Sequence, residues 1–270
     1  MDDRPIGVFD SGLGGLTTVR ELCRLLPEED IVYFGDTGRV PYGSRSRETI
    51  VKYARQDVAF LRTFDLKAIV IACGTVSTTA LDVLAAENPI PVLGVVAPAA
   101  RAAARATRSG SIGLIGTQAS IRSGAYERLI RAENPAARVL AQPCPLFVPL
   151  VENGRFRPGD VVIETVAAEY LAPLKEAGVD TLVLGCTHYP LLEKVIGAYM
   201  GPEVRLINSG AEGARVAADC LRERDALAGP GRGSCRCFVS DRQEDFSRLA
   251  STFLGWDVAQ AVEQVDISQY

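Results

Sequence analysis

Short apolar runs alternate along the chain with longer segments in which apolar residues recur at helical spacing. In one such segment the face of a helix is marked by Leu16, Val19, Cys23 and Leu26. The runs predicted to be buried strands are Ile6–Phe9, Ile31–Phe34, Ala68–Ala72, Pro91–Val96, Ser111–Ile115, Val139–Ala141, Thr181–Gly185 and Val204–Ile207. Continuous apolar strands that alternate with helices are typical of parallel sheets covered by helices on both faces. The pattern therefore predicts the α/β fold class.

A weak repeat relates the two halves of the chain. The strand that begins at Ile6 leads into a glycine loop and a helix, and Cys73 follows a later strand. The strand that begins at Ile112 opens the same series, which ends with Cys186. Both cysteines therefore come at the carboxyl end of a strand, the edge at which open α/β sheets bind ligands. On this pattern alone, two similar half-chains and a chance likeness of common strand–loop–helix units are equal alternatives.

The composition excludes several classes of protein. With 270 residues, 47% hydrophobic content and a net charge of −4, the chain is expected to form one large or two small folded domains, not a disordered protein. Its 29 basic residues do not exceed its 33 acidic ones, so no nucleic-acid partner is expected. No apolar stretch reaches the roughly 18 residues of a membrane span. Because the start does not resemble a secretory signal and the cysteines are odd in number, we expect reduced thiols and a cytoplasmic location.

Two loops that follow predicted strands are candidate ligand sites. Asp10–Gly15 comes between a strand and a helix, where glycines let the backbone approach a ligand and a helix N-terminus attracts a carboxylate. Its glycine spacing fits neither the dinucleotide fingerprint nor the phosphate loop, and a plain tight turn is an equal alternative. The second loop, Gly35–Thr37 with Pro41–Ser44, is interpreted either as one wall of a cleft or as a surface turn.

Cys73 and Cys186 are the candidate reactive groups. Each follows a predicted strand and precedes a predicted helix, and a helix N-terminus lowers the pKa of a thiol. His188, the only histidine in the chain, lies two residues beyond Cys186, although inert thiols and a structural histidine are the alternative. The cysteines interpreted as structural are Cys23, Cys144, Cys220, Cys235 and Cys237. The last two are expected to direct their thiols to opposite faces of a strand, so no metal site is predicted.

Two thiols on opposite walls of a cleft suit the removal of a proton from one face of a carbon and the delivery of a proton to the other face. One sulfur must be a thiolate and the other a thiol, and the two exchange roles when the substrate has the opposite handedness. A proton α to an amino-acid carboxylate leaves only where amides and hydroxyls hold the carboxylate and water is kept out. The hydroxyl groups expected to hold it belong to Ser11, Thr75, Thr117 and Thr187.

The sequence closely resembles the cofactor-independent glutamate racemases of bacterial cell-wall synthesis. The matching segments, all in the family's order, are IGVFDSGLGGLTTVREL, YFGDTGRVPYG, ACGTVS, IGLIGTQAS, LVENG and LGCTHYPLL, together with the region around Asn208–Gly210. The two cysteine motifs form a highly specific combination with DSGxGG, and the resemblance extends over essentially the whole chain.

The resemblance implies two similar parallel-sheet subdomains with helices on both faces and glutamate bound in the cleft between them, without a cofactor or a metal. We expect residues 1–97 plus 209–270 to form the first subdomain and residues 98–208 the second. The residues themselves predict a helix over Ala97–Ala106, near this boundary, and an exposed connector at Leu227–Gly233. The resemblance also implies a homodimer that supplies D-glutamate for peptidoglycan synthesis.

The same resemblance assigns roles to individual residues. Cys73 and Cys186 would transfer the protons. Asp10 would support Cys73, whereas Glu152 and His188 would support Cys186. The residues implied to contact the substrate are Asp10, Ser11, Tyr42, Gly43, Gly74, Thr75, Thr117, Thr187 and His188.

Two positions depart from the family pattern. Gly74 stands where Asn is usual, and the loss of an amide donor to a charged group would cost about 1.5–3 kcal/mol, a factor of ten or more in activity. Ser120 replaces a common Thr and keeps the hydroxyl.

Three alternatives to a glutamate racemase stay open. The first is a racemase of aspartate or another amino acid. The second is a thiol hydrolase that uses Cys186 and His188, although side chains two residues apart at a strand end are expected to point in different directions. The third is a catalytically weak family member that acts as a binding protein.

Overall fold

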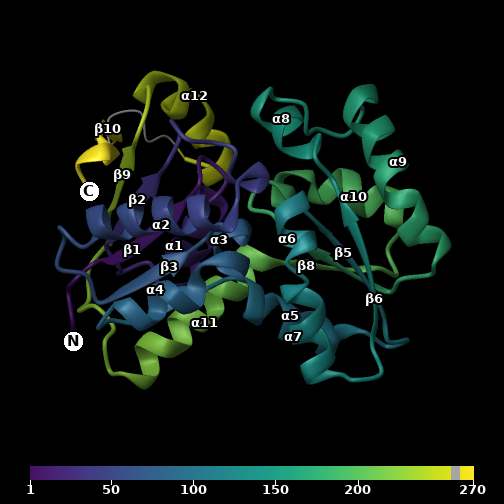
Figure 1. Cartoon of the computed structure of the whole chain (residues 1–270), viewed down its shortest axis with the longest axis horizontal. Coiled ribbons are helices and arrows are strands. Elements are labelled where there is room, and N and C mark those ends of the chain that lie inside the picture. Colours follow the sequence, from purple (N-terminus) through teal and green to yellow (C-terminus); the bar gives the residue numbers. More distant parts are fainter. Residues whose placement is uncertain (257–261) are drawn as a thin grey trace.

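Two parallel sheets lie side by side in the computed structural model, which describes residues 1–256 and 262–270 (Figure 1). The strands of the six-stranded sheet are, in order, β10 (Val262–Gln264), β9 (Cys235–Val239), β2 (Ile31–Gly35), β1 (Ile6–Asp10), β3 (Ala68–Ile71) and β4 (Val92–Gly94). Those of the four-stranded sheet are β6 (Arg138–Pro143), β5 (Ser111–Gly116), β7 (Thr181–Leu184) and β8 (Arg205–Asn208). Neighbouring strands pair in parallel throughout. The predicted α/β fold of two parallel-sheet subdomains is confirmed.

Helices cover both faces of each sheet, because strands that are buried on both sides need apolar partners on both sides. The six-stranded sheet carries α1 (Leu16–Leu25), α11 (Ser209–Glu223) and α12 (Gln243–Leu254) on one face, and α2 (Arg47–Leu61), α3 (Gly74–Thr79) and α4 (Leu81–Glu87) on the other. The four-stranded sheet packs α8 (Phe147–Glu152), α9 (Val161–Glu176) and α10 (Glu193–Met200) on one face, and α5 (Val96–Ala106) and α7 (Ala125–Glu133) on the other. The short elements are α6 (Gln118–Arg122) and the 3-10 helices η1 (Tyr42–Ser44), η2 (Tyr189–Leu192) and η3 (Ile267–Gln269).

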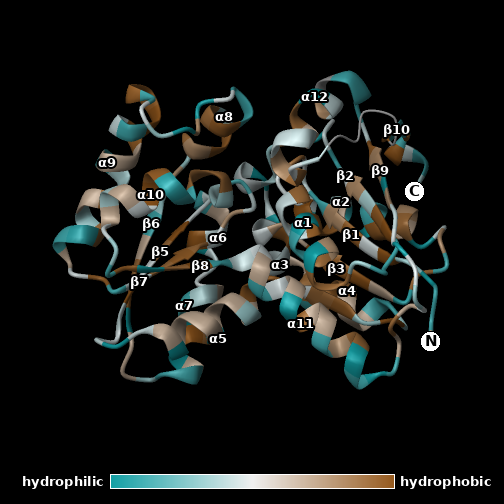
Figure 2. Cartoon of the chain, turned by 180° about the vertical axis from the view of Figure 1, so that it is seen from behind, coloured by the Kyte–Doolittle hydropathy of each residue, from teal (hydrophilic) through white to brown (hydrophobic). Residues whose placement is uncertain are grey.

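Apolar periodicity and capping explain the helices. On α1 the residues Leu16, Val19 and Leu22 are buried on one face, as their spacing predicts. The side chain of Asn208 accepts the backbone N–H of Ala211 at 3.1 Å and so caps α11. In Figure 2 the strands are largely brown, the hydrophobic colour, while teal, hydrophilic residues gather on the outer turns of the helices.

The strand register brings the loops of both sheets to one place. Ile6 pairs with both Ile31 and Ala68, so β1, β2 and β3 end at the same edge. In the other sheet Ile115 pairs with Leu184, so β5 and β7 also end together. Side chains just past these strand ends line one shared cavity, and the carboxyl edges of the two sheets therefore face each other.

Several predicted elements differ from those observed. The strand predicted over Pro91–Val96 is reduced to β4, because α5 begins at Val96 and matches the helix predicted over Ala97–Ala106. The strand-like run around Cys235 and Cys237 forms β9, as predicted, and β10 extends the sheet beyond the predicted strands. The segment Leu227–Gly233 connects α11 to β9 without a helix or strand.

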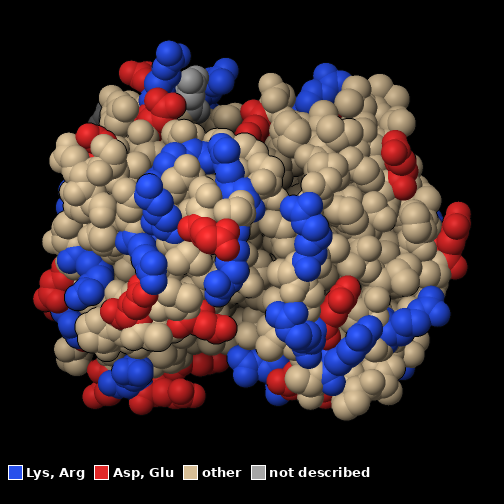
Figure 3. Space-filling model, viewed as in Figure 1, with Lys and Arg blue, Asp and Glu red and all other residues tan. Residues whose placement is uncertain are grey.

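The helices and the surface charge bear on membrane and nucleic-acid binding. None of the described helices is long and apolar enough to cross a membrane. On the face drawn in Figure 3, Lys and Arg side chains gather over the middle of the molecule, with acidic side chains among them.

Candidate active site

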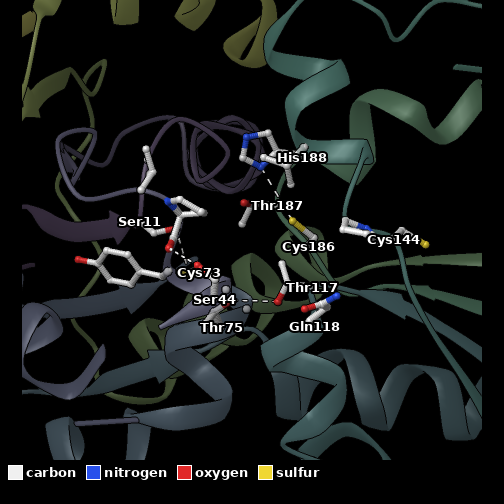
Figure 4. A pocket seen from close by; sticks show the side chains of 18 of the residues that line it. Ser11, Ser44, Cys73, Thr75, Thr117, Gln118, Cys144, Cys186, Thr187 and His188 are labelled. Carbon is white, nitrogen blue, oxygen red and sulfur yellow. Dashed lines mark hydrogen bonds between the residues drawn. The ribbon is translucent and has the colours of Figure 1, made fainter. Parts of the chain in front are cut away.

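A cavity of about 410 Å³ lies between the two sheets. Of the residues predicted from the sequence, it is lined on the side of the six-stranded sheet by Ser11, Tyr42, Gly43, Cys73, Gly74 and Thr75. On the side of the four-stranded sheet it is lined by Thr117, Glu152, Cys186, Thr187 and His188. Figure 4 shows Cys73 and Cys186 on opposite walls, with Thr75 and Thr117 meeting between them. Their hydroxyl oxygens are 3.1 Å apart, so this contact bridges the two walls.

Cys73 occupies the carboxyl end of the six-stranded sheet. It follows β3, precedes α3 and is 4% exposed, and its Sγ donates to Ser11 Oγ at 3.4 Å. Burial, with a smaller effect of the Asp10 carboxylate, raises the pKa of the Cys73 thiol to about 12. The predicted lowering of this pKa is therefore wrong. A helix of six residues does not offset the loss of water around the sulfur.

Cys186 sits on the opposite wall beside an imidazole. Its Sγ lies 3.9 Å from His188 Nδ1, and His188 Nε2 lies 2.9 Å from Glu152 Oε1. The expectation that Cys186 and His188 point in different directions is wrong, because the chain turns here and His188 adopts helical dihedral angles. The predicted helix after Cys186 is also replaced by a turn and the 3-10 helix η2. The result is a chain of contacts from sulfur to imidazole to carboxylate.

His188 is buried and charged. Burial alone would lower the pKa of His188, but the contacts with Cys186 and Glu152 outweigh it and raise the pKa to about 10. The imidazole is therefore protonated at neutral pH. None of the described residues that line the cavity is Lys or Arg, so this imidazolium is the positive side chain of the cavity.

Asp10 lies behind the wall of the cavity. It is 1% exposed, its Oδ2 accepts the N–H of Gly12 at 3.2 Å, and its Oδ1 has no hydrogen-bond partner among the described residues. Burial raises the pKa of Asp10, against the opposite effect of the charge on His188. Asp10 is near Cys73 but does not itself line the cavity. Its predicted support of Cys73 and its predicted contact with the substrate stay predictions.

Cys144, which was interpreted from the sequence as structural, belongs to the site. Cys144 lines the cavity on the wall of Cys186, and its carbonyl accepts the Tyr189 hydroxyl at 3.1 Å. Burial, with a smaller contribution from Cys186, raises the pKa of the Cys144 thiol. Its position just past the predicted strand Val139–Ala141 was the available signal, because loops at that edge of the sheet form the site.

Comparison with known proteins gives the family. Residues 9–217 match the family model described as Asp/Glu/Hydantoin racemase. The chain belongs to this racemase family. It is 49% identical over 256 residues to a glutamate racemase of Geobacter metallireducens, with 94% of each chain covered, and 46% identical over 258 residues to one of Chlorobaculum tepidum, with 95% and 94% covered.

Solved structures in the racemase family share the whole fold. A glutamate racemase isoform from Bacillus anthracis superimposes with a TM-score of 0.93 at 38% identity, covering 98% of each chain. A glutamate racemase from Francisella tularensis, solved in complex with D-glutamate, superimposes with a TM-score of 0.92 at 38% identity, covering 100% of each chain.

Gly74, which the sequence resemblance implies to be a departure from the racemase pattern, lies where the two walls touch. A Cβ built on Gly74 would come 2.8 Å from the carbonyl oxygen of Gly185, the residue before Cys186. A backbone oxygen cannot move aside as a flexible side chain can, so any larger residue would push the walls apart. Gly74 is therefore next to Cys73 in the chain and close to the backbone beside Cys186. The residue at this position affects the spacing of the two walls, and not only the hydrogen bonds to the substrate.

The hydroxyl of Tyr42 points away from this cavity. It donates to Asp36 Oδ2 and lies 3.0 Å from Asp57 Oδ2, and both carboxyl groups are fully buried. Arg39 contacts Asp36 at 2.6 Å and Asp57 at 2.8 Å. Because its hydroxyl donates to Asp36, Tyr42 contributes only its ring and backbone to the cavity. The network of charged groups also fixes the loop that carries Gly43.

The remaining predicted thiol geometry is wrong. Cys235 and Cys237 lie in β9 with their sulfur atoms 3.9 Å apart. Residues two apart in a strand share a face, so the thiols cannot point to opposite faces. Among the described residues, no group of three or more His, Cys, Asp or Glu is arranged to hold a metal ion.

Proposed function

We propose that this chain is a glutamate racemase that interconverts L- and D-glutamate by proton transfer between the substrate α-carbon and two cysteines. The observation that carries the proposal is that Cys73 and Cys186 line one cavity from opposite walls. Membership of the racemase family and the glutamate racemases among its relatives support the substrate.

The proton transfer uses the two sulfurs in turn. A thiolate on one wall removes the α-proton, an S–H bond forms, and the electron pair of the broken C–H bond stays on the α-carbon and its carboxylate. The thiol on the other wall then gives its proton to the opposite face of the carbon, which inverts the configuration. At neutral pH the raised pKa of Cys73 keeps this group a thiol, ready to donate. The imidazolium of His188, 3.9 Å from Cys186, favours negative charge on that sulfur.

Neutral groups hold most of the substrate in this proposal. Ser11, Thr75, Thr117 and Thr187 line the cavity and offer hydroxyl donors to the two carboxylates of glutamate. Donors fixed in a water-poor cavity stabilise the charge that develops when the α-proton leaves, without the cost of reorienting solvent. The described lining includes no Lys or Arg, so His188 supplies the positive charge nearest the reacting carbon.

The cellular role extends the same proposal. D-glutamate made by this reaction would enter peptidoglycan synthesis in the cytoplasm, and the enzyme would act as a homodimer without a cofactor, as the sequence resemblance implies. We also propose that residues 1–97 plus 209–270 and residues 98–208 are the two subdomains whose facing edges form the cleft.

The experiment that tests the proposal is proton NMR of L-glutamate and L-aspartate in D₂O with reduced protein and no added cofactor. We expect the α-proton signal of glutamate to disappear and that of aspartate to persist. Exchange of aspartate alone would indicate the rival racemase. No exchange of either amino acid by folded, reduced protein would overturn the proposal in favour of a binding protein.

Among the alternatives, the thiol hydrolase is supported by one observation of the structure, the contacts that link Cys186, His188 and Glu152. Nucleophile, base and orienting carboxylate are the parts of a thiol hydrolase. That mechanism gives Cys73 no role. Cys73→Ala would leave hydrolysis intact but abolish racemisation. Formation of D-glutamate from L-glutamate by the wild-type protein that is lost in this variant would exclude the hydrolase, whereas hydrolysis retained by both proteins without any D-glutamate would indicate it.

A further inference from the structure

The glycine loop between β1 and α1 lies directly against His188. A Cβ built on Gly14 would come 2.5 Å from His188 Nδ1 and 2.7 Å from Cε1, and would also overlap Thr187 Oγ1. Real Cβ atoms do not approach neighbours so closely, so this backbone contact requires glycine. Thr17 Oγ1 lies 2.9 Å from the carbonyl oxygens of both Gly14 and Thr187 and so links the same two segments. The loop therefore supports a side chain of the opposite wall, a role that its sequence did not distinguish from a tight turn.

A second group from the same side of the cleft contacts this imidazole. Phe253, on α12, is 1% exposed, and its ring centroid lies 5.5 Å from that of His188 with the planes at 88°. This edge-to-face arrangement is the favourable one for aromatic rings. Arg20 on α1 donates to the Phe253 carbonyl at 3.5 Å, which holds the end of α12 near the glycine loop.

We propose that Gly14 and Phe253 are positioning residues that hold the His188 imidazole with Nδ1 toward Cys186 and Nε2 toward Glu152. The inference rests on the proposed function and deepens it. Gly14 lies in the loop between β1 and α1, and Phe253 lies on α12, so both come from the side of the six-stranded sheet. His188 and Cys186 instead follow β7 of the four-stranded sheet. The orientation of His188 beside Cys186 on one wall therefore depends on residues of the other wall. In this proposal Cys73 does not depend on His188.

This difference between the two cysteines can be measured. L- and D-glutamate are equally stable, so kcat/KM must be equal in the two directions for every variant. A variant that slows proton transfer at Cys186 is instead detected by the kinetic isotope effects measured with α-deuterated L- and D-glutamate. When proton transfer at Cys186 becomes slow, the isotope effect rises for the enantiomer whose α-proton Cys186 removes. It falls for the other enantiomer, because loss of that α-proton on the Cys73 side is then no longer the slow step.

The variants are Gly14→Ala and Phe253→Leu, with Phe246→Leu as the matched control. Phe246 lies on the same helix α12 and is 3% exposed, but it packs against Tyr33 with ring centroids 6.1 Å apart. Because the chain contains a single histidine, the NMR signals of protein labelled with ¹³C and ¹⁵N in histidine report on His188 alone. Phe253→Leu keeps an apolar side chain in the core, so it tests the proposal even if Gly14→Ala fails to fold.

We expect Gly14→Ala and Phe253→Leu to lower kcat by about tenfold or more, part of the roughly 10²–10⁴ that a positioned acid–base group contributes. The His188 titration midpoint should fall from about 10 toward its ordinary value, and the isotope effects of the two enantiomers should diverge. Phe246→Leu should change neither the titration midpoint of His188 nor the isotope effects. Unchanged His188 signals and parallel isotope effects in folded Phe253→Leu would overturn the inference, as would an equal change in Phe246→Leu. Absence of exchange in the wild-type protein would instead overturn the proposed function, while the His188 titration would still test the positioning.

Discussion

At the scale of single residues, the positive charge of His188 depends on its contacts with Cys186 and Glu152. Glu152 Oε1 is 2.9 Å from Nε2, and the Glu152 side chain is 36% exposed. Solvent screens this contact, so its contribution is smaller than that of a buried pair. The contact nevertheless directs the charged ring toward Cys186.

Replacement of Glu152 by Gln should therefore change the pH dependence of racemisation. The pKa of His188 is raised to about 10, so the imidazolium persists below that pH and is lost as the pH rises through it. Without the carboxylate this loss should begin about one pH unit lower, because one of two stabilising contacts is gone. The pH profile of kcat measures the shift. A profile identical to that of the wild type would show that Glu152 does not act on His188.

A second prediction at this scale concerns Gly74. Gly74→Ala places a Cβ against the Gly185 carbonyl oxygen and should separate the two walls. Misplacement of reacting groups by about 1 Å can cost 10²-fold in rate, so we expect kcat/KM to fall more than tenfold in the folded protein. The kcat/KM of Gly74→Asn should fall as well, although this substitution introduces the side chain that the resemblance gives as usual at this position. Higher activity of Gly74→Asn would show that the missing amide matters more than the close approach of the walls.

At the scale of elements, the loop from β2 to α2 is held by a buried charged network. Tyr42 has one hydroxyl proton and contacts two carboxyl groups, so one of these contacts needs a proton on a carboxyl. Burial, followed by the charge of Asp36, raises the pKa of Asp57 well above its ordinary value. Asp57 is therefore the neutral member, and Arg39 pairs with the charged Asp36.

Two substitutions distinguish the members of this network. Asp57→Asn replaces a neutral group by a neutral group and should change the free energy of unfolding by less than about 1 kcal/mol. Arg39→Met leaves Asp36 buried without its cation and should cost about 3 kcal/mol, with a higher KM because the loop carrying Gly43 loosens. Urea unfolding and steady-state kinetics measure both effects. Equal destabilisation by the two substitutions would contradict this assignment of charge.

The elements also show how far the sequence alone can predict the structure. Apolar runs located the central strands and the edge where Cys73 and Cys186 lie, because burial of a parallel strand leaves a local pattern. The strand β10 leaves a weaker pattern, since two of its three residues are exposed. The contacts of His188 with Cys186 and Phe253 depend on a turn and on a helix far away in the chain, which no local pattern encodes.

At the scale of the whole molecule, a buried ion pair ties distant segments together away from the cleft. Lys67 pairs with Glu29, and both side chains are almost fully buried. Lys67 Nζ also donates to the carbonyl of Asp2 at 2.6 Å, and Glu29 Oε1 accepts the N–H of Ala228 at 2.9 Å. The N-terminal segment, the loop before β2 and the connector to β9 thus meet at one pair.

Lys67→Met should destabilise the protein by about 3–5 kcal/mol, because it leaves the Glu29 carboxylate buried without a cation. The double variant Lys67→Met, Glu29→Leu should recover much of this loss, since no charge stays buried. Urea unfolding measures both variants. A double variant as unstable as Lys67→Met alone would show that packing, and not the unpaired charge, accounts for the loss.

The central claim is that Cys73 and Cys186 serve opposite faces of one carbon, and the most direct test is the deuterium content of glutamate early in a reaction in D₂O. L-glutamate should yield D-glutamate that carries deuterium at the α-carbon, because the second thiol has exchanged with solvent. The recovered L-glutamate should still carry its α-proton. D-glutamate that retains the original proton, or deuterium entering both enantiomers equally from the start, would contradict two separate bases and require a single group that serves both faces.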